Sequence, residues 1–194
     1  MRNNTKPAYV HHDPIAILRS LFGLKDVDIC SVSRTEDLVE IAIEHHVGDE
    51  RCRSCGARAR LKDRSATTYV DLPCFGEPAR VIWWKHRFRC PNSACSTQSW
   101  SISDHRIAAK NCQLTTRCAK WATEQVGKGR SVDEVAAELR SSWHQVNNAV
   151  VIYGDALLRL DHKRLNKTNA IGLDETSFVK LKNRQGSAHT LVDS

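Results

Sequence analysis

Cys52-Arg-Ser-Cys55 and Cys90-Pro-Asn-Ser-Ala-Cys95 are two short cysteine pairs that decide how the middle of this 194-residue chain folds. Each spacing lets two thiolates reach one ion from a single tight turn, and two such turns complete a tetrahedral shell. We therefore expect Cys52, Cys55, Cys90 and Cys95 to bind a structural Zn²⁺ ion. Because protein atoms would fill all four positions, the ion stabilises the fold and leaves no position for a substrate.

Disulfide bonds are the main alternative for these cysteines. No secretory signal is recognisable in the sequence, so we expect a cytoplasmic chain, whose thiols stay reduced. A redox role for Cys52 and Cys55 is weaker still, because the βαβ context of thioredoxin-like proteins is missing. His86 and Cys74 remain alternative ligands. The cysteines outside the two pairs are expected to be small core residues: Cys30, Cys74, Cys112 and Cys118.

Positive charge surrounds the cysteine pairs. Residues 51–106 contain eleven Lys and Arg against four Asp and Glu, which equals the whole formal excess of +7. This concentration favours a polyanionic partner such as double-stranded DNA. Residues 81–89 alternate like a strand, with basic and aromatic side chains on opposite faces. The basic face is expected to contact DNA phosphates, a merely solvated surface being the alternative: Lys85, Arg87 and Arg89.

Residues 107–166 have the periodicity of three helices. The first is expected from Leu114, with apolar residues at helical spacing up to a stop at Gly127 or Gly129. Ser131-Val-Asp-Glu134 is a capping box, in which the serine accepts from a backbone N–H and the glutamate reaches back. It opens the second helix.

A second capping box, Ser142-Trp-His-Gln145, opens the last helix after a turn at Arg140-Ser141. Its buried stripe is expected to contain Trp143, Val146 and Val150. Three helices in this order are typical of a helix-turn-helix, whose last helix enters the major groove of DNA, although an ordinary three-helix bundle has the same spacing. The predicted base contacts lie near the start of the last helix: His144, Gln145, Asn147 and Asn148.

Residues 1–50 carry no chemistry that the sequence identifies. A helix is expected from Pro14, followed by two short strands. His45 and His46 are adjacent, but adjacent strand residues point to opposite faces, so a shared metal ion is disfavoured.

The order of these features resembles a family of insertion-sequence transposases. The most specific pieces are the Cys52–Cys55 pair, the basic stretch Lys85-His-Arg-Phe-Arg-Cys90-Pro-Asn, and Ile171-Gly-Leu-Asp174-Glu-Thr-Ser-Phe178. Members of this family combine an N-terminal zinc module, a helix-turn-helix and a ribonuclease-H-like catalytic domain with an Asp-Asp-Glu triad. The resemblance implies that Asp174 is the first catalytic residue of the triad and holds a Mg²⁺ ion.

The resemblance stops short of a complete catalytic domain. Only 20 residues follow Asp174, whereas the family places the rest of the triad far beyond it. We therefore expect the chain as given to be truncated and to cut or join no DNA. Mg²⁺ is expected to bind only in a full-length relative.

The expected fold class is α+β, in four parts. Residues 1–50 form an N-terminal helix and strands, 51–106 a small β-rich Cys₄ zinc module, 107–166 the helix-turn-helix domain, and 167–194 the first β-hairpin of an incomplete ribonuclease-H-like domain. The expected role is to recognise the terminal inverted repeats of an insertion sequence in DNA transposition, which is an inference from family resemblance.

Two other functions fit the same parts. A zinc-dependent helix-turn-helix transcriptional regulator needs no nuclease ancestry, and the β-rich tail around Asp174 disfavours it. A zinc-stapled protein-interaction module would bind a protein and no DNA. No run approaches the ~18 apolar residues of a membrane span. We expect double-stranded DNA as the partner, with no membrane and no small-molecule substrate, and a homo-oligomer stays open.

Overall fold

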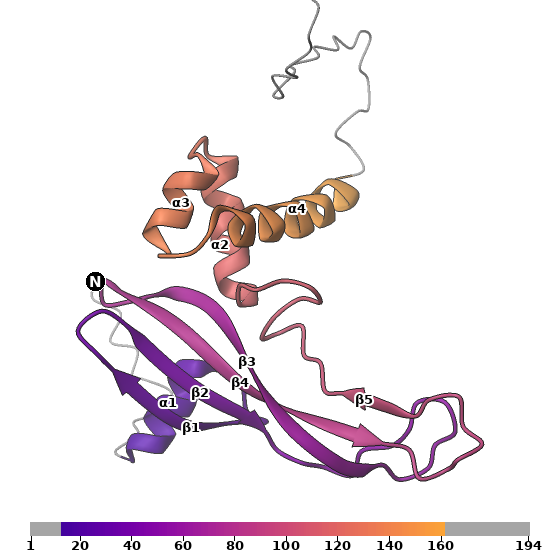
Figure 1. Ribbon diagram of the computed structural model, residues 1–194. Helices are drawn as coiled ribbons and strands as arrows, with labels where there is room; N and C mark the ends of the chain where they lie inside the picture. Colours follow the sequence, from indigo (N-terminus) through magenta and orange to yellow (C-terminus); the bar gives the residue numbers. More distant parts are fainter. Residues whose placement is uncertain (1–12, 162–194) are drawn as a thin grey trace, which may run out of the picture. The chain divides into compact units, whose positions relative to one another are not determined.

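The computed structural model describes residues 13–161, and this part of the chain is a mixed α+β protein with four helices and a five-stranded sheet (Figure 1). The α+β class expected from the sequence is confirmed. The hairpin predicted within residues 167–194, and with it Asp174, lies outside the described residues. Within the described part, no helix is both long and apolar enough to cross a lipid bilayer.

Two hairpins side by side make the sheet, with the strand order β1-β2-β4-β3. β1 (Val27–Arg34) and β2 (Val39–His45) form one antiparallel hairpin, and β3 (Arg60–Cys74) and β4 (Glu77–Arg89) form a longer one. β2 and β4 join the hairpins in parallel. The sheet therefore contains strands from both sides of residue 50, the boundary expected between the first two parts of the chain.

The β3–β4 hairpin carries the cysteine loops at its open end. Its closed end is a two-residue loop, Phe75-Gly76, with positive φ values of 52° and 85°. Positive φ at both positions is what a type I′ turn requires, and the twist of this turn matches that of the strands. At the open end, β5 (Ser99–Ser101) pairs with the last residues of β4.

One face of the sheet holds the first hydrophobic core. Trp83 and Ile43 lie at its centre, opposite each other in the β2–β4 register, and each is at most 1% exposed. α1 (Pro14–Phe22) starts at Pro14, as the sequence predicts, and contributes Phe22 to this core. The loop after β5 covers the core with Ile107.

α2 (Thr116–Gly127), α3 (Val132–Glu138) and α4 (Trp143–Leu160) surround a second core. They form where the periodicity predicts three helices. The residues at its centre have no exposed surface: Leu114, Cys118, Ala122, Val135, Leu139 and Val146.

Two of the unpaired cysteines are core residues, as expected. Cys112 and Cys118 are buried, whereas Cys74 is half-buried and Cys30 is exposed. The expectation for Cys30 is therefore wrong. The strand register shifts at this residue, so no β2 residue lies opposite Cys30, and its thiol is outside the packed face, where it donates to the carboxylate of Glu44.

Candidate metal centre and nucleic-acid interface

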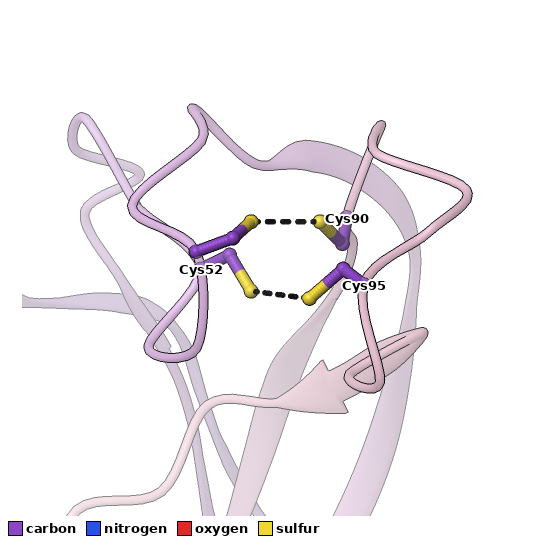
Figure 2. A group of neighbouring side chains, drawn as sticks. Cys52, Cys90 and Cys95 are labelled. Carbon is purple, nitrogen blue, oxygen red and sulfur yellow. Dashed lines mark hydrogen bonds between the residues drawn. The ribbon is translucent and has the colours of Figure 1, made fainter.

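The two cysteine loops face each other at the end of the β3–β4 hairpin, and Figure 2 shows Cys52 opposite Cys90 and Cys95. The Sγ atoms of Cys52 and Cys95 lie 3.7 Å apart, and those of Cys55 and Cys90 lie 3.5 Å apart. All four Sγ atoms lie within 4.8 Å of one another. The structure thus brings together the four cysteines that the sequence singles out.

The sulfur spacing fits a tetrahedral metal shell. A metal–sulfur distance of about 2.3 Å places the corners of a tetrahedron about 3.8 Å apart, whereas the sulfurs of a disulfide lie about 2.05 Å apart. Cys52, Cys90 and Cys95 are buried and Cys55 is exposed, so the cluster lies just below the surface. These four residues could hold one metal ion. The alternative ligands His86 and Cys74 are not part of this cluster.

Tight turns position the sulfurs. In the first loop Gly56 has a φ of 72°, and its N–H donates to the carbonyl of Cys52. In the second loop the side chain of Asn92 accepts from a backbone N–H two residues on. The hydroxyls of Ser54 and Thr97, one from each loop, lie 2.6 Å apart. Each loop is therefore shaped by its own short-range bonds, and the hydroxyl contact joins them.

The surroundings of the four cysteines favour the thiolate form at one position and disfavour it at another. Backbone N–H groups of Ser54 and Cys55 lower the pKa of Cys52 to about 7. Burial raises the pKa of Cys90 to about 12. A bound cation would offset the mutual repulsion of the thiolates, so metal binding and deprotonation of the remaining thiols are coupled.

The basic residues of β4 have unequal environments. Arg87 and Arg89 are exposed. Lys85 is half-buried: its Nζ donates to the hydroxyl of Tyr69 at 2.5 Å and lies 4.5 Å from the centre of the Trp83 ring. The charge of Lys85 is therefore engaged inside the protein, which strand alternation alone does not reveal.

The turn between α3 and α4 is supported by the sheet. Arg140 has a φ of 42°, in the left-handed region that costs a non-glycine residue about 1 kcal/mol. The N–H of Ser141 donates to the carbonyl of Ala136 and closes the end of α3. Arg80 of β4 donates to the carbonyl of Arg140 at 2.6 Å. Because this turn sets the direction of α4, the sheet helps to fix that helix.

Both predicted capping boxes are present. Ser131 accepts from the N–H of Glu134, whose carboxylate accepts from the N–H of Ser131. At α4, the N–H of Gln145 donates to Ser142, and the side-chain oxygen of Gln145 accepts from the N–H of Ser142. This oxygen also accepts from the hydroxyl of Ser141, so the cap occupies it.

The first turns of α4 present a face with three polar residues and one valine. His144, Asn147, Asn148 and Val151 lie on one side of the helix, at positions i, i+3, i+4 and i+7. All except the half-buried Asn147 are exposed. The amide of Asn148 donates to the carbonyl of Asn111, and its oxygen stays available.

The expectation that Trp143 belongs to the buried stripe of α4 is wrong. This side chain is 42% exposed, whereas Val146 and Ala149 are fully buried. Trp143 is the first residue of the helix, so it lies at the edge of the packed face and against His144, with ring centres 5.3 Å apart.

The three helices, their turn and the exposed start of α4 have the layout of a helix-turn-helix. Residues 104–151 match the helix-turn-helix domain of transposase family ISL3. The matching segment contains α2, α3 and the first half of α4. It supports a DNA-binding region of an insertion-sequence transposase. Searches of the curated proteins and of the solved structures find no match to this chain.

A second polar cluster lies where the helix-turn-helix domain begins, and sequence reasoning missed it. Nε2 of His45 lies 2.9 Å from the carboxylate of Asp104, and Arg106 binds both Asp104 and Asp26 at 2.6 Å. Burial alone would raise the pKa of Asp104, but the bonds from Arg106 and His45 outweigh it and lower that pKa. Because Arg106 already neutralises both carboxylates, this cluster joins the loop to the sheet and is a poor cation site.

Proposed function

We propose that this chain is the DNA-binding region of an insertion-sequence transposase and that it recognises the terminal inverted repeats of its element. The observation that carries the proposal is the exposed start of α4 inside a segment that matches a transposase helix-turn-helix. In this arrangement α4 enters the major groove and reads base edges. The role that the family resemblance implies for Asp174, holding Mg²⁺ for strand cleavage, concerns a residue outside the described part and is not needed for DNA binding.

We propose the base contacts from the hydrogen-bonding groups of α4 that are not already bonded within the described part of the chain. His144 and Asn147 make no side-chain hydrogen bond with another residue of the described part. Asn148 keeps its oxygen, and Gln145 keeps only its amide nitrogen. We add Val151, because its exposed side chain lies on the same face and can contact a thymine methyl group.

We propose Zn²⁺ as the ion of the cysteine cluster. Four thiolates at tetrahedral spacing are the ligand set that structural zinc prefers. The ion would tie the two loops together and take no part in a reaction, since the protein occupies all four positions.

The test is selection of bound sequences from a random duplex library, followed by affinity measurements on the selected site. We expect a preferred sequence that also occurs at both ends of the element encoding the chain. His144→Ala should lose about 1–3 kcal/mol on the selected site and little on random DNA. His46→Ala, which removes an exposed histidine directly after β2, is the matched control. A chain that binds duplex DNA without any sequence preference would contradict the proposal.

A further inference from the structure

One face of the β3–β4 hairpin, next to the cysteine loops, carries positive charge without acidic partners. Arg60 lies directly opposite Arg89 in the strand register, and Arg87, two residues from Arg89, lies on the same face. All three are exposed. Asp63 is opposite Arg87, but among residues 13–161 none of the three arginines forms an ion pair. We call Arg60, Arg87 and Arg89 the arginine face.

Asp63 is the acidic residue in register on this face, and it forms no ion pair with a residue of the described part; two acidic residues from other segments of the chain are paired with other cations. Asp49 pairs with Arg51 and Arg58, and Glu44 pairs with Arg64. Like charges directly opposite each other in a hairpin destabilise it. The pairing of Arg60 with Arg89 therefore works against folding, and a bound anion would relieve it.

On the reverse side of the same strands, next to the cysteine loops, apolar side chains fix which way the arginines point. Leu61, Phe88 and Trp100 are in register there, and Trp100 packs against the cysteine cluster. On the arginine side, β5 places Ser99 opposite Arg89 and Ser101 opposite Arg87. Guanidinium groups with neighbouring hydroxyls are the groups that bind phosphate oxygens.

The arginine face continues toward the helix-turn-helix. Lys85 is on the same face as Arg87, and it lines a groove of about 900 Å³ together with Ser101, Lys110 and Asn111. The carbonyl of Asn111 accepts from Asn148 of α4 at 2.8 Å. Arg87, Ser101 and Lys110 thus lead from the cysteine loops toward α4, while the ammonium group of Lys85 is engaged by Tyr69 and Trp83.

We infer that the arginine face and this groove form a phosphate track, which binds the sugar–phosphate backbone of the same DNA duplex that α4 enters. The inference rests on the proposed DNA-binding function. Contacts of this kind fix the register of a protein on DNA and supply affinity that does not depend on base sequence. A random-sequence duplex is therefore a sufficient ligand for the test.

The test measures the affinity of the full chain, loaded with metal, for a random 30-base-pair duplex as a function of salt. For the double variant Arg60→Ala/Arg89→Ala, we expect the slope of log affinity against log salt to fall by roughly 0.9 for each cation removed. At 0.1 M salt this corresponds to a loss of about eightfold per cation. The control Lys25→Ala/Arg34→Ala removes two exposed cations away from the track and should keep the wild-type slope.

Folding and DNA binding should respond in opposite directions. Removing the Arg60–Arg89 repulsion should keep or raise the thermal midpoint while affinity falls, so loss of binding cannot be ascribed to unfolding. Asp63→Asn removes the acidic residue in register with Arg87 and should strengthen binding. An unchanged salt slope in the double arginine variant would overturn the inference.

The outcomes separate this inference from the proposed function. In one outcome the double arginine variant binds random duplex like the wild type while His144→Ala still loses affinity for the selected site. In that case the phosphate-track inference is wrong, and the proposal that α4 reads bases is kept. If the wild-type chain binds no duplex at low salt, both fail. Tighter binding of single-stranded RNA than of duplex DNA would overturn the choice of partner.

Discussion

The cysteine loops and the helix-turn-helix are both small, but different forces hold them. Around the cysteines the buried cluster consists of Cys52, Cys90 and Cys95, with only Ala57 and Trp100 packed against it. The helical core contains eleven buried residues. Burial can stabilise the second region, whereas the first has too little apolar surface and, with the proposed Zn²⁺ ion, would depend on metal ligation. The two regions should therefore fail independently.

The largest effect is expected from Cys90→Ser, which removes a buried ligand. Binding of structural zinc is worth about 10–16 kcal/mol in small zinc modules, so the variant should retain no metal. Hydrogen exchange should then become fast around residues 50–58 and 90–101 and stay slow in the helical core. Cys30→Ser, at an exposed cysteine outside the cluster, is the control and should keep its metal. Equal loss of protection from hydrogen exchange in both regions would contradict their independent unfolding.

Leu139→Ala tests the other region. Leu139 is fully buried between the three helices, and truncating such a leucine costs about 2–5 kcal/mol. We expect a lower denaturation midpoint for the helices and an unchanged metal content. Leu157→Ala, at a leucine that is 58% exposed on α4, should change the free energy of unfolding by less than about 0.5 kcal/mol. Release of metal by the Leu139 variant would show that the regions are coupled.

Asp71→Asn tests the joint between the sheet and the helices. The buried carboxylate of Asp71 accepts from Thr115 at 2.6 Å and from Nε of Arg117 at 2.9 Å. Because Arg117 is half exposed, its loss of a charged partner is screened, and we expect a cost of about 1–3 kcal/mol. Hydrogen exchange should accelerate first at the start of α2. Asp49→Asn, in an exposed ion pair, is the control.

Sequence patterns were informative wherever the partners are close along the chain. The capping serines, the cysteine spacings and the start of α1 at Pro14 follow from residues a few positions apart. The bonds between Asp71 and Arg117 and between His45 and Asp104 join residues 46 and 59 positions apart. No local pattern marks such pairs, and none predicts that β2 joins β4 in parallel. Alternation likewise gives the face of Lys85 but not the aromatic rings that engage it.

The smallest effect is expected at the two capping boxes, which contribute to the helical region locally. Ser131→Ala removes the acceptor for the N–H of Glu134 and should cost about 1 kcal/mol. Bonds from the backbone and side chain of Ser131 lower the pKa of Glu134. The contribution of this carboxylate is therefore present above its unfolded pKa and disappears as the pH falls through its lower folded pKa. In denaturant titrations both proteins should lose the carboxylate contribution in acid, and the difference between them should shrink only by the share of the Ser131 hydroxyl bond to Glu134, because the lost acceptor for the N–H does not titrate.

Ser142→Ala makes the matching change at the start of α4, since Ser142 accepts from the N–H of Gln145 in the same way. Its cost in stability should be similar. Its effect on DNA should differ, because this cap holds the first turn of α4, where the proposed base contact His144 lies, whereas Ser131 caps a helix that only supports it. We expect the Ser142 variant to lose affinity for the selected duplex and the Ser131 variant to keep it. Equal affinities would show that the first turn of α4 does not position the base contacts.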